Sequence, residues 1–156
     1  MKAVIQRVTS AKVDIDGKTV GSIGCGFLIL LGVCQGDTEK ECKILSDKIA
    51  KMRIFCDEND KMNLSLLDFQ NCDEPYGVLV VSQFTLCANV RHGNRPDFFG
   101  AAKPQEAIPL YEQFMKNLSD DYGIPVQHGE FGADMKVSLL NDGPVTIIVD
   151  TDDLKK

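Results

Sequence analysis

The sequence has no tryptophan and only two histidines, His92 and His128, among its 156 residues. Neither histidine belongs to a recognisable Ser-His-Asp or Cys-His arrangement. The chain also lacks a G-x-S-x-G elbow, a Walker loop and an H-E-x-x-H helix. The usual hydrolase and nucleotide-binding patterns are therefore absent, and we expect any catalytic chemistry to come largely from main-chain groups and from the substrate.

A long hydrophobic run is also absent. The longest apolar stretch, residues 27–33, is far shorter than the roughly 20 residues that cross a bilayer as a helix. Residues 1–7 have no apolar stretch ahead of their first charges, which is not the pattern of a signal peptide. We therefore expect no membrane partner and predict a cytoplasmic protein.

Cysteine is present, but without the C-x-x-C spacing of a metal-binding knuckle. Because no secretory signal is expected, the cysteines are predicted to be reduced and mostly buried in apolar surroundings. A redox or metal-binding protein is the disfavoured alternative, and neither a metal nor a cofactor is expected. The six residues are Cys25, Cys34, Cys42, Cys56, Cys72 and Cys87.

Positive charge is scarce, since the net charge of −6 differs from the basic surplus of most nucleic-acid-binding proteins. The exception is the window 89–103, where Arg91, His92, Arg95 and Lys103 face a single acid, Asp97. We predict that the two arginines and the lysine form a local phosphate-binding patch. The alternative is a solvated loop.

One domain spanning residues 1–156 is expected from the length and from the 44% of hydrophobic residues. The predicted class is α+β, with a largely antiparallel, barrel-like sheet and two main helices. Asp16-Gly17 predicts a hairpin, Asp37 or Thr38 the first helix cap, and Pro104 the start of the second helix. Strands are expected at 2–15, 18–23, 27–33, 53–56, 77–84, 126–131, 135–140 and 145–150, and helices at about 38–52 and 104–122.

The segment Ser82-Gln83-Phe84-Thr85 follows an apolar run, residues 78–81, that is typical of a fully buried strand. The end of such a strand is a rigid place for exposed groups. If the amides of Phe84 and Thr85 have no partner in the sheet, they are able to receive a developing oxyanion. The alternative is an ordinary strand with a threonine at its edge.

A second segment, Asn141 to Thr146, contains Asp142-Gly143-Pro144 and lies between two predicted strands. Asp-Gly followed by Pro is first of all a turn signal. The sharper interpretation is a cis bond before Pro144, because proline lowers the free energy of the cis form to about 0.5–1 kcal/mol above trans. Carbonyl groups held rigidly in this way exclude an intruding methyl group.

Six segments resemble the D-aminoacyl-tRNA deacylases: residues 1–8, 61–65, 82–86, 93–98, 131–135 and 141–146. They follow the family's order from the first residue to about residue 150. The resemblance implies a homodimer that hydrolyses the ester joining a D-amino acid, or glycine, to the 3′-terminal adenosine of tRNA.

The resemblance also implies roles for single residues. The family's Gly-cisPro motif falls on Gly143-Pro144, beside Asn141, and is expected to reach into the partner subunit's site and refuse L-amino acids. Arg7 is expected to brace that motif, and Phe131 and Met135 to line the pocket of the terminal adenine. The expected catalytic residues are Ser82, Gln83, Phe84 and Thr85.

Two alternatives stay open at the level of the sequence. The favoured mechanism is attack by water, with the amides of Phe84 and Thr85 polarising the ester and the ribose 2′-OH orienting the water. Thr85 as a covalent nucleophile is the alternative. For the function, the alternative to catalysis is a non-catalytic module, related to synthetase editing domains, that binds tRNA ends.

Overall fold

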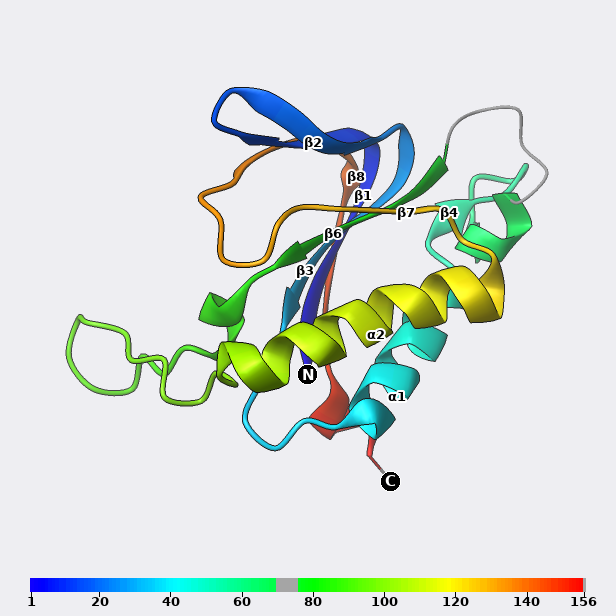
Figure 1. The fold of residues 1–156 in the computed structure, drawn as a ribbon. Coiled ribbons are helices and arrows are strands. Elements are labelled where there is room, and N and C mark those ends of the chain that lie inside the picture. Colours follow the sequence, from blue (N-terminus) through cyan, green and yellow to red (C-terminus); the bar gives the residue numbers. More distant parts are fainter. Residues whose placement is uncertain (70–75, 156) are drawn as a thin grey trace.

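The computed structural model describes residues 1–69 and 76–155. Residues 70–75, which include Cys72, lie outside the described residues. The two helices, α1 (Glu39–Ala50) and α2 (Pro104–Tyr122), lie on the same side of the sheet (Figure 1). The strands of the main sheet follow the order β2 (Lys18–Ile23), β1 (Lys2–Ile15), β3 (Cys25–Gly32), β6 (Tyr76–Ser82) and β7 (Val126–His128). The strand β8 (Lys136–Asp150) also belongs to this sheet and pairs with β1. The short strands β4 (Phe55–Cys56) and β5 (Met62–Leu64) form a separate pair.

The long strand β1 organises the sheet. Its first half pairs with β3 and its second half with β2, while β8 follows its opposite edge, and all three pairings are antiparallel. Asp16 and Gly17 have φ angles of 50° and 77°. The β1–β2 hairpin therefore has the positive-φ turn that an Asp-Gly pair predicts.

β3, β6 and β7 run parallel to one another, which the prediction of a largely antiparallel sheet did not include. The chain passes from β3 to β6 through α1, and from β6 to β7 through α2. A parallel pair needs such a crossover, because a tight turn joins only antiparallel strands. The predicted α+β class, with a barrel-like sheet and two main helices, is confirmed, and the sheet is mixed.

Both helices begin with the signals that the sequence predicts. Thr38 caps α1, with the Glu41 side chain accepting from the Thr38 amide at 2.9 Å. Pro104 is the first residue of α2, and Gly123 ends it with a φ of 64°. Pro109 lies within α2 without ending it. No helix in the described part of the chain is both long enough and apolar enough to cross a membrane.

Two glycines lie where neighbouring segments approach one another closely. A Cβ at Gly21 in β2 would lie 2.6 Å from the carbonyl oxygen of His128 in β7. A Cβ at Gly77 in β6 would lie 2.6 Å from the carbonyl oxygen of Pro125. The approach of β2 to β7, and that of β6 to the residue before β7, therefore depend on residues without a side chain.

The cysteines differ from the prediction that all are reduced and mostly buried. Cys34, after β3, forms a disulfide with Cys87, the last residue of the 3-10 helix η2 (Phe84–Cys87). Cys25 and Cys56 are free but exposed. Cys42 is free and buried as predicted, and burial raises the pKa of its thiol to about 12. The disulfide joins residues 53 positions apart, so no local pattern reveals it.

Candidate functional site

The first part of the site lies where β6 ends. Residues 77–81 are buried, which fixes the strand in the core. The amide of Gln83 makes the last bond to the neighbouring strand, donating to the carbonyl oxygen of Leu31 at 2.8 Å. The strand predicted to residue 84 therefore ends at Ser82, and the chain turns into η2. As a result Phe84 is 55% exposed.

Within the described part of the chain, the first two amides of η2 have no hydrogen-bond partner. The Leu86 amide donates to the carbonyl oxygen of Gln83 at 3.2 Å, and the Ala88 amide to that of Thr85 at 3.1 Å. Neither the Phe84 amide nor the Thr85 amide donates to any residue that the structure describes. The first amides of a helix have no acceptor within it. These two are therefore available to an oxygen atom of a ligand.

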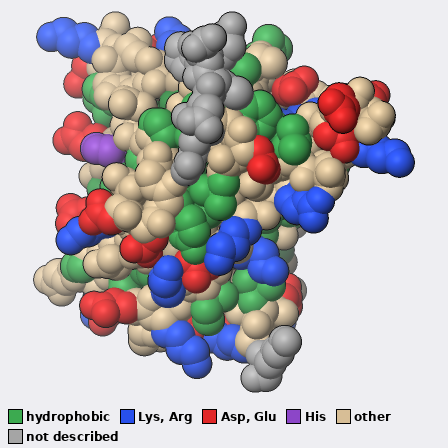
Figure 2. Space-filling model, turned by 90° about the vertical axis from the view of Figure 1, so that its right-hand side faces the viewer, with side chains coloured by type: hydrophobic (Ala, Val, Ile, Leu, Met, Phe, Trp, Pro, Cys, Tyr) green, Lys and Arg blue, Asp and Glu red, His purple; other side chains and the backbone are tan. Residues whose placement is uncertain are grey.

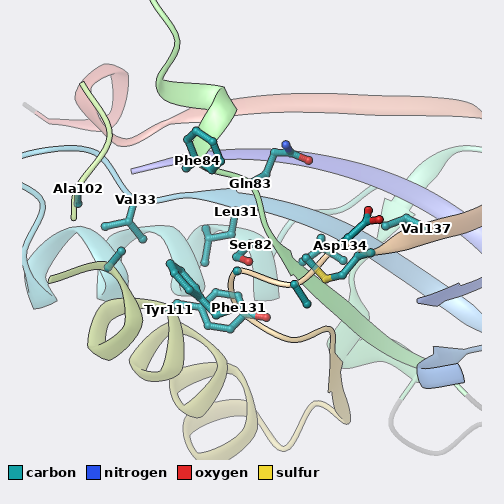
Figure 3. Close-up of a pocket in the computed structure, with 15 residues that line it drawn as sticks. Leu31, Val33, Ser82, Gln83, Phe84, Ala102, Tyr111, Phe131, Asp134 and Val137 are labelled. Carbon is teal, nitrogen blue, oxygen red and sulfur yellow. The ribbon is translucent and has the colours of Figure 1, made fainter. Parts of the chain in front are cut away.

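A cavity of about 270 Å³ opens beside Ser82. Five of the predicted site residues line it: Ser82, Gln83, Phe84, Phe131 and Met135. In Figure 3 two aromatic rings lie together at its floor with Ser82 above them, and Phe84 projects from η2 over the far side. The structure thus brings together two predicted segments that are about fifty positions apart in the chain.

Tyr111 of α2 supplies the second ring of the floor. Its ring centroid is 5.9 Å from that of Phe131, in an edge-to-face arrangement. The Tyr111 hydroxyl donates to the carbonyl oxygen of Val80 at 3.0 Å, which links α2 to β6 two residues before Ser82. Burial raises the pKa of this hydroxyl, which therefore stays protonated. Tyr111 lies within the helix that the sequence predicts at about 104–122, and nothing in the helical spacing marks it as a cavity residue.

No general base lies beside Thr85. The Gln83 side-chain amide donates to the Thr85 hydroxyl, and an amide group is not a base in either orientation. Neither His92 nor His128 lines the cavity. Among residues 1–69 and 76–155, no group of His, Cys, Asp and Glu side chains is arranged to hold a metal ion.

The second predicted segment forms a bulge in β8. On either side of it the strand pairs with β1, Thr146 with Gln6 and Asn141 with Val8. Residues 142–145 therefore face a single residue of β1, Arg7. The sequence predicted a turn between two strands, at 135–140 and 145–150, but β8 is one continuous element. An insertion of this kind bends a strand locally and displaces the inserted residues.

Two side chains tie the bulge to β1. Arg7 is only 7% exposed. Its Nε donates to the carbonyl oxygen of Asp142 at 3.2 Å, and its Nη1 donates to that of Ile54 at 2.7 Å. The Asn141 side chain donates to the carbonyl oxygens of Arg7 and Val145, at 2.9 and 3.0 Å. The main chain on both sides of the bulge is therefore fixed by hydrogen bonds.

Gly143 and Pro144 form the exposed tip of the bulge, and the peptide bond between them is cis. Gly143 has a φ of 125°, which L side chains rarely adopt. A Cβ there would lie 2.9 Å from Cγ2 of Val145 and 3.0 Å from Nη2 of Arg7. The position therefore requires glycine.

The bulge and the cavity are separate on one chain. None of the predicted site residues in or beside the bulge lines the cavity next to Ser82. Among the described strands, β8 pairs only with β1, so the opposite edge of β8 is open. Leu140 and Ile148 on this strand are 62% and 77% exposed. An open edge with exposed apolar side chains is a surface on which another chain can pack.

The predicted phosphate patch lies between η2 and α2. Arg91 and Arg95 are exposed on a projecting loop, and Lys103 is exposed directly before α2. Figure 1 shows this loop extending away from the sheet, on the side opposite β4. The face that carries β4 also has Lys and Arg side chains, interspersed with Asp and Glu (Figure 2). The loop is thus one of several surface regions that offer cations to a polyanion.

The chain matches the family model described as D-Tyr-tRNA(Tyr) deacylase over residues 4–150. A D-aminoacyl-tRNA deacylase of Lactobacillus acidophilus is 57% identical over 96% of this chain and 99% of that protein. One of Geotalea uraniireducens is 56% identical over 97% of this chain and 94% of that protein.

Among solved structures, one described as "c-Myc DNA Unwinding Element Binding Protein" is 42% identical, with a TM-score of 0.87 over 96% of this chain and 98% of the other. A probable eukaryotic D-amino acid tRNA deacylase has a TM-score of 0.75 over 95% of this chain and 97% of the other. It is 16% identical, so this second likeness concerns the fold alone. With the family model and these relatives covering nearly its whole length, the chain belongs to the D-Tyr-tRNA(Tyr) deacylase family.

Proposed function

We propose that this protein hydrolyses the ester bond of D-aminoacyl-tRNA and releases the free D-amino acid and the tRNA. The observation that carries this proposal is the pair of amides, those of Phe84 and Thr85, that have no hydrogen-bond partner among the described residues and directly follow Ser82 and Gln83 at a cavity with an aromatic floor. Membership of the deacylase family supports the same reaction. The aromatic floor suits a flat, apolar group such as the terminal adenine, which stacks on side-chain rings.

The amides of Phe84 and Thr85 serve as the oxyanion site in this proposal. When water attacks the ester carbonyl, negative charge develops on the carbonyl oxygen, and two fixed N–H groups stabilise it. In this proposal the 2′-OH of the terminal ribose orients the attacking water; among the described residues no imidazole lines the cavity, and Asp134 is its single carboxylate. The proton of the water passes to the departing 3′ oxygen, so the products are a carboxylic acid and a ribose hydroxyl.

Covalent catalysis by Thr85 is the less favoured route. A hydroxyl is a weak nucleophile at neutral pH unless an adjacent base removes its proton. The neighbour of the Thr85 hydroxyl is the side-chain amide of Gln83, which donates to it. We propose that Gln83 orients Thr85 for binding and that Thr85 forms no bond with the substrate.

We propose a homodimer in which the tip of each bulge enters the cavity of the partner subunit. The tip, Gly143-Pro144, is exposed and lies away from the cavity of its own chain. The open edge of β8 and the exposed side chains of Leu140 and Ile148 offer an apolar contact surface. In this arrangement each cavity is complete only when two chains associate.

The bulge is the proposed source of chiral selectivity. Arg7 and Asn141 hold its main chain, so the carbonyl groups of Gly143 and Pro144 cannot yield to an L side chain. Exclusion needs no contact with the D side chain, and many D-amino acids are therefore accepted. A thousandfold preference corresponds to about 4 kcal/mol, which a single unrelieved clash supplies. Glycine has no side chain to exclude, and glycyl-tRNA is a substrate by the same reasoning.

The purified protein should therefore release tyrosine from D-tyrosyl-tRNA and not from L-tyrosyl-tRNA. Release is followed with radiolabelled amino acid under conditions where spontaneous hydrolysis is slow. Equal rates for the two substrates would contradict the proposed chiral gate. Tight binding of both without release would favour the non-catalytic module that binds tRNA ends.

A further inference from the structure

Two adjacent aromatic side chains are exposed on the loop that leads from η2 to α2. Phe98 is 39% exposed and Phe99 is 83% exposed. The proposed oxyanion site and the bulge do not use Phe99, and its ring has no stacking partner among the described residues. An exposed ring of this size is a common sign of a binding surface.

Hydrogen bonds hold the main chain that carries these two rings. Asn89 and Asp97 form an antiparallel bridge, with bonds of 2.9 and 3.1 Å between their main-chain groups. The Phe99 amide donates to the Asp97 carboxylate at 3.3 Å, and the Ala101 amide donates to the Phe98 carbonyl oxygen at 3.0 Å. The loop therefore presents both rings from a fixed main chain.

The exposed rings continue from the edge of the cavity. Phe84 lines the cavity, and its ring meets the ring of Phe98 edge to face, with centroids 5.2 Å apart. Phe98 and Phe99 also line a shallow hollow together with Arg95. An aromatic surface thus leads from the cavity to a hollow that carries a cation.

The charge of the loop favours a polyanion on this surface. Residues 88–103 hold Arg91, Arg95 and Lys103 against one acid, Asp97, within a chain of net charge −6. The Asp97 carboxylate is already engaged by a main-chain amide. Aromatic rings next to cations are the combination that binds single-stranded nucleic acid, because bases stack on the rings and phosphates pair with the cations.

We propose that Phe99, together with Phe98, is a stacking platform for the unpaired nucleotides that precede the terminal adenosine of tRNA, with Arg95 beside their phosphates. The proposal rests on the proposed function, which places the terminal adenosine in the cavity. The strand that leaves the cavity passes Phe84 and then meets the platform. Stacking on a ring does not depend on base identity, so the platform serves tRNAs of any amino acid.

The test compares Phe99→Ala with the wild type on two substrates. One is D-tyrosyl-tRNA, and the other is the 3′ ester of D-tyrosine with adenosine alone, which has no preceding nucleotides. For D-tyrosyl-tRNA we expect KM to rise about tenfold with kcat nearly unchanged, since one stacked base accounts for a change of this size. For the adenosine ester we expect no change in either constant.

Two further variants separate stacking from general effects on the loop. Val90→Ala removes an aliphatic side chain that is 70% exposed on the same loop, and it should leave KM unchanged for both substrates. Phe99→Trp keeps a flat ring and should retain the KM of the wild type for D-tyrosyl-tRNA. An equal loss in Phe99→Ala and Val90→Ala would overturn the proposal, and so would a loss that Phe99→Trp does not rescue.

A binding experiment keeps the inference distinguishable from the proposed function. Fluorescence anisotropy measures the Kd for a labelled RNA oligonucleotide that ends in the single-stranded sequence C-C-A, with a blunt RNA duplex as comparison. Phe99→Ala should weaken binding of the single strand about tenfold and leave the duplex unaffected. If the wild type cleaves neither ester, the proposed function is wrong. The change in Kd between the wild type and Phe99→Ala still shows whether Phe99 binds single-stranded nucleotides.

A second copy of the chain is the competing occupant of this surface. Analytical ultracentrifugation of Phe99→Ala should show the same mass as the wild type at the same concentration. A lower mass would make Phe99 a subunit contact and overturn the platform, and an unchanged Kd for the single-stranded oligonucleotide would do the same.

Discussion

The Nε of Arg7 lies 3.2 Å from the carbonyl oxygen of Asp142, so a buried cation holds the residue directly before Gly143. The Nη2 atom of the same guanidinium would lie 3.0 Å from a Cβ on residue 143. Arg7 belongs to β1, at the far end of the sequence from the bulge. The shape of the bulge is therefore set by the strand that it faces, in addition to its own residues.

The substitution Gly143→Ala should weaken both folding and chiral selectivity. The new methyl group meets Arg7 and Val145 at a φ that disfavours alanine, which lowers the free energy of unfolding by about 1–3 kcal/mol. Displacement of the bulge should raise the rate on L-tyrosyl-tRNA relative to D-tyrosyl-tRNA about tenfold, or about 1.4 kcal/mol. Chemical denaturation and deacylation of the two substrates measure these effects.

Gly36→Ala is the matched control for that experiment. Gly36 has a φ of 84°, and a Cβ there would meet no atom within 4 Å. It carries the strain of the backbone without the contact with Arg7, so its ratio of D to L rates should equal that of the wild type. A comparable change of the ratio in Gly36→Ala would show that loss of stability alone explains the result.

Replacement of Thr85 by alanine should leave most of the deacylase activity. The proposed oxyanion site consists of main-chain amides, which alanine retains, and the Thr85 hydroxyl has an amide donor as its neighbour. We expect kcat within about tenfold of the wild type, because the loss of one hydrogen-bonding group is worth about 0.5–1.5 kcal/mol. Abolished turnover, with a normal unfolding curve, would restore Thr85 as the nucleophile.

A substrate whose terminal ribose lacks the 2′-OH should be cleaved much more slowly. No imidazole or carboxylate of the described chain lines the cavity next to the two amides except Asp134. In the proposed mechanism the 2′-OH, and not Asp134, orients the attacking water. Single-turnover rates on D-tyrosyl-tRNA with 2′-deoxyadenosine at its end measure the effect. Undiminished turnover would point to Asp134, and the variant Asp134→Asn would then be the next to assay.

Charge reversal at Arg91 and Arg95 should weaken the binding of tRNA, whichever amino acid the tRNA carries. Loss of two phosphate contacts lowers the slope of log Kd against log salt by about 1–2. The double variant Lys40→Glu, Lys48→Glu introduces the same change of charge on α1 and serves as the control. If both double variants lose the same affinity, the net charge of the protein is responsible and the loop is not the patch.

Glu41 should make folding sensitive to acid. The Thr38 hydroxyl, followed by the Thr38 amide and Lys155, lowers the pKa of Glu41 from 4.5 to about 2. The stabilisation is fully present above pH 4.5, where the unfolded chain has also lost this proton, and it disappears as the pH falls towards 2. Its size is on the order of 2 kcal/mol.

The variant Glu41→Gln measures this contribution directly. Its deficit in the free energy of unfolding, relative to the wild type, should shrink as the pH falls from 4.5 to 2. Glu39→Gln, on the same helix turn but without the capping contact, should show a deficit that does not vary in this way. A constant deficit for Glu41→Gln would show that the cap acts through geometry and not through charge.

The sequence allowed prediction of features that depend on local chemistry. Pro104 and Gly123 mark the ends of α2 because proline lacks an amide and glycine accepts a positive φ. Ser82 and Phe131 were assigned to one site by resemblance, and both line the cavity. Tyr111 was not found, because a tyrosine at helical spacing looks the same whether it faces the core or a cavity.

Features that depend on distant pairing were not predictable from local patterns. The Asn141 to Thr146 segment has the composition of a turn, and only the pairing of its flanks with β1 makes it a bulge. The bond between Cys34 and Cys87 depends on the approach of η2 to the end of β3. Parallel pairing of β3 with β6 depends on where α1 returns the chain.

The close approaches at Gly21 and Gly77 limit which substitutions this fold can accept. At both positions the carbonyl oxygen of the neighbouring segment occupies the space of a methyl group. Random mutagenesis aimed at new substrates can therefore alter the residues around the cavity. Every variant that still folds should keep glycine at both positions. The pattern of retained positions in such a library would map the closure of the sheet without any further structure.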